Sequence, residues 1–429
     1  MKISKIIKDS SYAIYGLGLS GNSAFKFLKK KNVKKIYTWD DKKNKNNKKK
    51  FNLFKKALDI VDYIVISPGI NIQKTKFKLA LSKNKKKIIT DLDLFYMQKI
   101  PVKSIVITGT NGKSTACKLI QHIFKTNRLD AQLGGNIGKP ILDLKIGKKS
   151  VVIIEASSFQ LAYTKFIKPT LAVILNITSD HLDWHNTITN YKNSKLKIFS
   201  KQDGNDIALL NNEKLIKLFK KKNYLSKLKF FKGDTLNNII KKKITNNYLI
   251  SQPNFENLEF ANQISRIFKI KKKIFLKAVN TFKGLPHRQE IFLKKNKITF
   301  INDSKATSFI STKYALKNNS NIYWIFGGLP KIKDKFNFQG IKSNIIKSFI
   351  IGKKTNYFKN QVKKKIKFKI SFNLNDAIKD VFKELLLIKN KRITVLFSPA
   401  SASYDQFNSF VDRGNQFKKI TRSYVKKFF

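Results

Sequence analysis

The chain has 429 residues, of which 42% are hydrophobic, and 89 Lys and Arg against 26 Asp and Glu give it a formal net charge of +63. This length allows several domains with separate cores, and the single cysteine, Cys117, excludes an internal disulfide, which fits the reducing cytosol. No run approaches the roughly 18 apolar residues that span a bilayer and glycines break the apolar run near the N-terminus, so we expect a cytoplasmic protein without a signal peptide.

The positive charge is spread along the chain and is not concentrated in one element. Lysine occurs with asparagine in turns, and arginine, the preferred reader of phosphates and bases, is scarce. A+T-rich coding explains this pattern, so we expect no nucleic-acid partner. A basic nucleic-acid-dependent ATPase is the remote alternative, and its hydrolysis would fall steeply with salt.

The first predicted unit begins with an apolar strand and a glycine-rich turn. The strand Tyr12–Tyr15 leads into GLGLSG at 16–21, and a second strand over 33–39 ends on Asp40. A GxGxxG turn with an acid about twenty residues later is typical of a Rossmann-like fold that holds a diphosphate. The pattern leaves open whether that diphosphate belongs to NAD, FAD or a nucleotide sugar, so a nicotinamide oxidoreductase is an alternative.

The most informative stretch of the chain follows a strand predicted over 104–108. This strand runs into GTNGKST at 109–115 and then into a helix. Backbone N–H groups of such a turn bind phosphates, and the start of the helix adds its positive dipole. Lys113 can then reach the terminal phosphates, while a Ser114 or Thr115 hydroxyl can ligate magnesium. Although Ile107 replaces the first glycine of the usual P-loop, the sequence predicts a site for a nucleoside triphosphate.

Two further strands of the second unit end on polar residues. One delivers Glu155, and another, over 171–177, precedes His181. Ligands gather at the carboxyl ends of parallel strands, so we expect both side chains to face the same crevice as Lys113. His181 and His185 have the spacing of a zinc pair, but no third ligand motif accompanies them. We therefore expect magnesium there and a structural role for His185.

A third block begins near Gly284 and carries strands over 323–326 and 394–397. Strands that alternate with helical patterns predict an α/β fold with parallel sheets. We expect three domains: a Rossmann-like domain over 1–92, a central P-loop-type ATPase domain over 93–283, and a Rossmann-like α/β domain over 284–429.

Eight motifs in this order resemble those of the Mur ligases. They are the GLGLSG turn, TGTNGKST, GGNIG at 134–138, EASSFQL at 155–161, DHLD at 180–183, GLPHR at 284–288, NDSKAT at 302–307 and SPASASYDQF at 398–407. The resemblance implies an ATP-dependent amide ligase of peptidoglycan precursor synthesis that works through an acyl phosphate. The last two motifs favour the addition of D-glutamate to UDP-N-acetylmuramoyl-L-alanine. Another Mur-type amino acid ligase is the alternative.

The resemblance implies that the domain over 1–92 binds the UDP-sugar and that the domain over 284–429 binds D-glutamate. It also assigns roles to individual residues. It places Gly109, Thr110, Asn111, Gly112, Lys113, Ser114, Thr115, Asn257, Arg288 and Asp303 in the ATP site. It places Leu19, Ser20, Asp40, Ser67 and Asn136 in the UDP-sugar site, and Lys305, Thr307, Lys331, Ser403 and Phe410 in the D-glutamate site. The expected catalytic residues are Lys113, Glu155, His181 and Lys195. Two magnesium ions would be held by Ser114, Glu155, His181 and Lys195, the last as a carbamate. We expect a monomer that is not inserted into a membrane.

Overall fold

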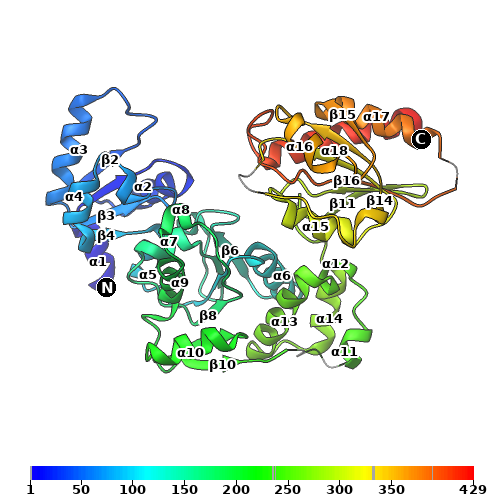
Figure 1. Cartoon of the computed structure of the whole chain (residues 1–429). Coiled ribbons are helices and arrows are strands. Elements are labelled where there is room, and N and C mark those ends of the chain that lie inside the picture. Colours follow the sequence, from blue (N-terminus) through cyan, green and yellow to red (C-terminus); the bar gives the residue numbers. More distant parts are fainter. Residues whose placement is uncertain (1, 234–235, 237, 331–333, 389) are drawn as a thin grey trace. The chain divides into compact units, whose positions relative to one another are not determined.

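The computed structural model describes residues 2–233, 236, 238–330, 334–388 and 390–429. It has two compact units, Met1–Phe282 and Lys283–Phe429, which are called unit 1 and unit 2 (Figure 1). Mixed α/β units built on parallel sheets confirm the predicted fold class. The three-domain division stays a prediction. Within the described residues, no helix combines the length and apolar character needed to cross a membrane.

The first sheet of unit 1 is parallel and has the strand order β2-β1-β3-β4. The glycine turn follows β1, and a Cβ at Gly21 would lie 1.8 Å from the carbonyl oxygen of Gly16, so only glycine allows α2 to approach the strand this closely. The strands are β1 (Tyr12–Tyr15), β2 (Ile36–Trp39), β3 (Tyr63–Ile66) and β4 (Ile88–Ile89). The helices are α1 (Lys2–Asp9), α2 (Leu19–Lys30), α3 (Lys48–Ile60), α4 (Lys78–Lys83) and α5 (Asp91–Met97).

The second sheet of unit 1 is also parallel, with the order β10-β9-β8-β5-β7-β6. Strands β7 and β8 are buried along their whole length, and β5 between them is buried after its exposed first residue, as expected when helices cover both faces. The strands are β5 (Lys103–Thr108), β6 (Ala131–Gly135), β7 (Val151–Glu155), β8 (Leu171–Ile174), β9 (Ile207–Leu210) and β10 (Lys227–Phe230).

Helices of the second sheet form two apolar layers. One contains α6, α13 and α14, which lie side by side in Figure 1, and Cys117 of α6 is fully buried in it. The other contains α5, α7 and α10. The helices are α6 (Lys113–Thr126), α7 (Ser158–Tyr163), α8 (Leu182–His185), α9 (Ile188–Leu196), α10 (Glu213–Lys221), α11 (Asn238–Lys242), α12 (Asn247–Ile250), α13 (Gln252–Ile267) and α14 (Lys272–Thr281).

A buried carboxylate ties the chain between the two sheets of unit 1 in place. Asp93 of α5 accepts hydrogen bonds from the backbone N–H and the hydroxyl of Thr90, at 2.8 and 3.1 Å. Its second oxygen accepts from the hydroxyl of Thr164 and from the N–H groups of Lys165 and Phe166, at 2.7 to 2.8 Å. Five donors on one carboxylate satisfy this buried group and fix the segment that joins the sheets.

Unit 2 contains one six-stranded sheet with the order β11-β12-β16-β13-β14-β15. Only the edge strand β11 is antiparallel to its neighbour. The strands are β11 (Glu290–Lys295), β12 (Ile298–Asn302), β13 (Ile322–Gly327), β14 (Ile345–Ile351), β15 (Phe368–Phe372) and β16 (Ile393–Phe397). The helices are α15 (Phe309–Lys317), α16 (Thr355–Val362), α17 (Leu374–Leu386) and α18 (Phe410–Phe428). The first two pack on one face and the last two on the other.

Candidate active site

The loop 109–112 joins the central strand β5 to helix α6. Gly112 has φ +82°, in the left-handed region, and a Cβ there would lie 2.3 Å from Oδ1 of Asn257. The position therefore requires glycine both for its backbone conformation and for space. The loop is packed against α13, so the structure brings Asn257, a residue predicted for the ATP site, to the predicted phosphate loop.

Two residues that the sequence analysis did not single out hold this loop. Asn176, just after β8, accepts from the N–H of Thr110 through its carbonyl and from the N–H of Asn111 through Oδ1, both at 2.9 Å. The hydroxyl of Tyr191 lies 2.9 Å from Oγ1 of Thr110. Both positions could have been noticed in the sequence, because Asn176 closely follows a buried strand and Tyr191 lies one helical turn before Lys195.

The ammonium of Lys113 lies among carbonyl groups of the loop. Its Nζ donates to the carbonyl oxygens of Gly109 at 2.8 Å and Thr110 at 2.9 Å. These bonds keep the cation at the start of α6, where the helix dipole also favours an anion. The arrangement suits the binding of a phosphate chain by the loop and the lysine.

Glu155 ends β7 with one oxygen bonded and one oxygen free. Oε1 accepts from Nδ2 of Asn136 at 2.9 Å, whereas the buried Oε2 has no hydrogen-bond partner among the described residues. Only 2% of Glu155 is exposed. A buried, unpartnered carboxylate oxygen is costly, and a cation would compensate it. The contact also joins Asn136, predicted for the sugar site, to this carboxylate.

His181 precedes helix α8 in a left-handed conformation, with φ +52°. Its half-exposed ring lies 4.8 Å from that of Phe159, centroid to centroid, and its Nε2 lies 3.4 Å from a carboxylate oxygen of Asp180. A positive φ is uncommon for residues other than glycine and marks a constrained position. The side chain therefore combines an accessible nitrogen with a fixed backbone.

Lys195 is a buried lysine next to the phosphate loop. It is 1% exposed, and its Nζ donates to the carbonyl oxygen of Gly109 at 2.8 Å and lies 3.3 Å from Oγ1 of Thr108. The same Nζ lies 4.7 Å from the ring centre of Tyr191. Burial, and then the charge of Lys113, lower the pKa of Lys195 to about 6. The amine is therefore mostly neutral at pH 7.

Four of the residues predicted for the UDP-sugar site lie at the glycine turn after β1: Leu19 and Ser20 begin α2, and Asp40 and Ser67 form hydrogen bonds with the turn. Asp40 accepts from the N–H of Leu17 at 2.7 Å, and Ser67 donates to the carbonyl oxygen of Gly16 at 2.7 Å. Burial raises the pKa of Asp40, but hydrogen bonds from the N–H groups of Leu17, Lys43 and Lys42 outweigh it and leave a lowered pKa. Leu19 is 83% exposed at the start of α2. An ionised acid thus anchors the turn.

In unit 2, Asp303 follows β12 and is buried. It accepts from the hydroxyl of Ser398 at 2.7 Å and from the N–H of Gln289 at 3.1 Å. Burial raises its pKa to about 7, although these bonds and the charge of Arg288 oppose the shift. The contacts join the predicted NDSKAT and SPASASYDQF segments to the residue that follows GLPHR.

The residues predicted for D-glutamate are partly brought together. The Nζ of Lys305 lies 3.9 Å from the ring centre of Phe410, at the start of α18. Ser403 is buried and Thr307 is partly exposed. Lys331 lies outside the described residues.

A buried arginine, not singled out by the sequence analysis, lies under the same segments. Arg413 of α18 is 0% exposed and donates to the hydroxyl and the carbonyl oxygen of Ser304, at 3.1 and 2.8 Å, and to the carbonyl oxygen of Ser401 at 3.0 Å. Its NH1 has no hydrogen-bond partner among the described residues. Burial lowers its pKa to about 10, so the guanidinium stays charged at neutral pH.

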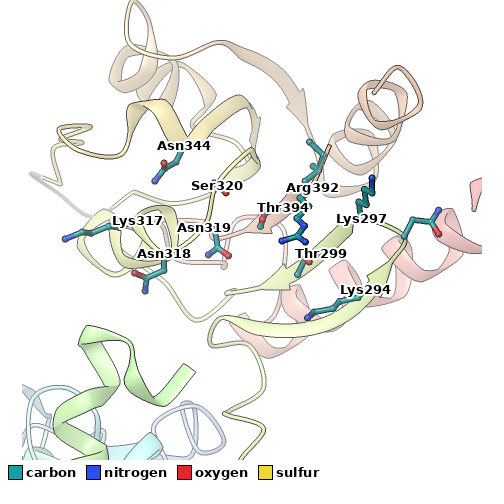
Figure 2. Close-up of a pocket in the computed structure, with 12 residues that line it drawn as sticks. Lys294, Lys297, Thr299, Lys317, Asn318, Asn319, Ser320, Asn344, Arg392 and Thr394 are labelled. Carbon is teal, nitrogen blue, oxygen red and sulfur yellow. The ribbon is translucent and has the colours of Figure 1, made fainter. Parts of the chain in front are cut away.

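A polar cavity of about 740 Å³ opens at the amino ends of β12 and β16 (Figure 2). Asp303 and Ser398 follow the carboxyl ends of the same two strands, so the cavity lies at the opposite ends of these strands. None of the predicted site residues lines it. Its basic side chains are Lys294, Lys297, Lys317 and Arg392.

The sequence of this chain is similar to sequences of known ligases. The Mur ligase middle domain matches residues 107–249. The chain is 34% identical over 443 residues to the UDP-N-acetylmuramoylalanine–D-glutamate ligase of Rickettsia prowazekii, covering 97% of this chain and 98% of that protein. It is 36% identical over 454 residues to the ligase of the same name from Buchnera aphidicola, covering 95% and 97%.

Solved structures show the same fold at low sequence identity. The UDP-N-acetylmuramate–alanine ligase of Thermotoga maritima matches with a TM-score of 0.57 and 14% identity, over 97% of this chain and 100% of that chain. The MurF ligase of Thermotoga maritima, solved in complex with ADP, matches with a TM-score of 0.56 and 15% identity, over 88% and 92%.

Proposed function

This chain belongs to the Mur ligase family, and on that premise we propose that it is an ATP-dependent ligase that joins D-glutamate to UDP-N-acetylmuramoyl-L-alanine in peptidoglycan precursor synthesis. The observation that carries the proposal is the match over nearly the whole chain to ligases named for that reaction. The phosphate loop, Glu155 and Lys195 supply a physical account of how unit 1 would contribute.

The reaction needs an activated acid, because a carboxylate oxygen is a poor leaving group. A carboxylate oxygen of the sugar peptide attacks the γ-phosphorus of ATP, the bond to ADP breaks, and an acyl phosphate forms. The amine of D-glutamate then attacks the acyl carbon, loses a proton, and expels phosphate. Positioning and charge neutralisation dominate such phosphoryl transfer. Lys113 and the N–H groups of the loop would hold the phosphate chain.

The residues around Glu155 fit a magnesium ion. No group of three or more His, Cys, Asp or Glu among the described residues could hold a metal without other ligands, so phosphate oxygens would have to complete the shell, as is usual for magnesium. The unpartnered Oε2 of Glu155 would supply one oxygen ligand and the Ser114 hydroxyl a second, whereas His181 would belong to a second ion. Bound magnesium would neutralise charge on the phosphates.

Lys195 is proposed to carry a carbamate. The neutral amine attacks the carbon of carbon dioxide, an N–C bond forms as one C=O π bond breaks, and a proton leaves the nitrogen to solvent, which converts the neutral amine into a buried anion. The lowered pKa and the neighbouring Lys113 favour the neutral amine that this step requires. The product would be a further oxygen ligand for magnesium.

The roles proposed for unit 2 come from the same family motifs. Arg288 and Asp303 would contact the phosphates and ribose of ATP, and Lys305, Thr307, Ser403 and Phe410 would bind D-glutamate. In unit 1, Leu19, Ser20, Asp40 and Ser67 would line the uridine diphosphate site. The hydrogen bonds that fix Asp303 and Asp40 support these assignments, because each carboxylate is already oriented.

Phosphate release tests the proposed function. The purified chain is supplied with magnesium, ATP and UDP-N-acetylmuramoyl-L-alanine while the amino acid is varied. We expect release that depends on D-glutamate and on the sugar peptide together. Faster release with L-lysine, diaminopimelate or L-glutamate would assign the chain to another amino acid ligase. Release stimulated by RNA without an amino acid would support the nucleic-acid-dependent ATPase.

A further inference from the structure

His185 ends helix α8 as a buried histidine with both a polar and an aromatic partner. Its Nε2 lies 3.0 Å from the hydroxyl oxygen of Ser158, the first residue of α7. Its ring is 7° from parallel to the ring of Phe159, with centroids 5.7 Å apart, and meets the ring of Tyr191 in α9 at 70° and 5.2 Å. One imidazole therefore joins three helices of unit 1.

Each of these partners also reaches a residue of the proposed active site. The ring of Phe159 lies 4.8 Å from that of His181. Tyr191 approaches the phosphate loop through its hydroxyl and the Nζ of Lys195 through its ring. Ser158 is the third residue after Glu155, at the other end of a short turn from β7 to α7. The three connections meet at His185.

The surroundings require a ring and a nitrogen at the same position. The Ser158 side chain is buried, so loss of the imidazole nitrogen would leave its hydroxyl without that partner, which is unfavourable for a buried polar group. Glutamine could replace the hydrogen bond but would lose the ring contacts with Phe159 and Tyr191. Phenylalanine could replace the ring but not the bond. A purely apolar core position would need only the ring.

We propose that His185 is a positioning residue that keeps Phe159 against His181, and Tyr191 against Lys195, in the arrangement that binds the divalent metal. The inference rests on the magnesium residues of the proposed function and adds a side chain that contacts neither metal nor substrate. Residues that orient metal ligands typically contribute 10–100-fold to metal affinity.

The experiment compares metal binding in two variants of the full chain. Mn²⁺ replaces Mg²⁺ and is titrated in the presence of ADP, with free Mn²⁺ measured by electron paramagnetic resonance. We expect His185→Phe, which keeps the ring and removes the nitrogen, to weaken Mn²⁺ binding about tenfold. Ser158→Ala removes the partner hydroxyl alone and should weaken binding in the same direction. The melting temperatures show whether each variant is folded.

A second histidine of unit 1 provides a matched control. His122 of α6 also has its Nε2 3.0 Å from a hydroxyl, that of Thr281, and its ring lies 5.8 Å from that of Phe282. His122→Phe should bind Mn²⁺ like the parent chain. Parent-like Mn²⁺ affinity in a folded His185→Phe variant would overturn the inference, and if that variant does not fold, Ser158→Ala decides. A parent chain that binds Mn²⁺ with ADP but releases no phosphate contradicts the proposed function and not this inference.

Discussion

Among the described residues, each unit buries one lysine or arginine side chain next to its predicted ligand-binding segments, and the two side chains differ in chemistry. Lys195 in unit 1 and Arg413 in unit 2 both donate to backbone carbonyl oxygens and serine or threonine hydroxyls, and no carboxylate accepts a hydrogen bond from either in the described parts of the chain. Burial lowers the pKa of Lys195 to about 6 and that of Arg413 to about 10. At neutral pH the lysine can lose its charge, whereas the arginine keeps it.

Lys195 can lose its proton and its positive charge at neutral pH, whereas Arg413 cannot. A buried ammonium can release its proton and react as an amine, which is the chemistry that a carbamate needs. A guanidinium stays protonated, so its burial must be supported permanently by hydrogen bonds. We therefore expect substitutions of Lys195 to affect chemistry and substitutions of Arg413 to affect the stability of unit 2.

The largest effect is expected when Lys195 is replaced. Lys195→Ala removes the proposed carbamate and should reduce D-glutamate-dependent phosphate release by roughly a thousandfold, a loss typical for a group that acts in the transition state. Short carboxylic acids such as acetate or propionate should restore part of the rate, because they return an anion to the cavity. Rates measured at constant pH with increasing concentrations of the added carboxylic acid check this.

Lys195→Arg is the sharper control for that variant. It gives unit 1 a permanent cation like the one in unit 2, and the cation fills the space that a carboxylic acid would occupy. We expect the same loss of activity without rescue. Rescue of Lys195→Arg, or absence of rescue in Lys195→Ala, would contradict the carbamate.

A smaller effect, on stability, is expected for Arg413→Met. The substitution roughly keeps the volume but leaves the carbonyl oxygens of Ser304 and Ser401 without these donors, so we expect a loss of about 2–3 kcal/mol in the free energy of unfolding. Hydrogen exchange should show the loss in β13 of unit 2 and not in β5 of unit 1. Arg422, also in α18, contacts the ring of Phe292, and Arg422→Met is the control that should change little.

The last expected effect is a pH dependence of stability in unit 2 due to Asp303. Burial raises its pKa from 3.8 to about 7, so the folded state binds more protons than the unfolded state between these values. Its contribution to stability is full below pH 4 and is lost as the pH rises toward 7, by at most about 1.4 kcal/mol per pH unit. Asp303→Asn should remove this slope in urea unfolding between pH 5 and 8. A constant difference from the parent across that range would contradict the raised pKa.

The elements that could be predicted from sequence are those with sharp local boundaries. The strand Tyr12–Tyr15 has the bounds predicted for it, because a glycine turn ends this apolar run. The strand predicted over 33–39 begins only at Ile36, and that over 171–177 ends at Ile174. At those ends the apolar pattern continues beyond the paired residues, so pairing with the neighbouring strand sets the boundary. The edge strand β10, Lys-Leu-Lys-Phe, has too little apolar pattern to be recognised.

Site residues could be predicted from sequence where one continuous segment contains all the residues of the motif. The phosphate loop, with α6 starting at Lys113, needed only local sequence. Packing between distant segments was not readable, since Asn257 meets Gly112 only because α13 packs on α6. The same holds for Arg413, whose partners Ser304 and Ser401 lie in two other loops, and for the contact of His185 with Ser158. These contacts arise from the tertiary fold, and residue type alone does not reveal them.

The sole cysteine gives this enzyme a practical advantage. Cys117 is a buried residue of α6 and is enclosed in the apolar layer that this helix forms with α13 and α14. Burial raises the pKa of its thiol well above the ordinary value, so the reactive thiolate is scarce and inaccessible to reagents. Cysteines introduced at exposed positions such as Lys201 in unit 1 and Lys359 in unit 2 can therefore be coupled to maleimide dyes with the natural thiol left in place. Energy transfer between the two dyes would then report the distance between the two labelled positions, with and without substrates.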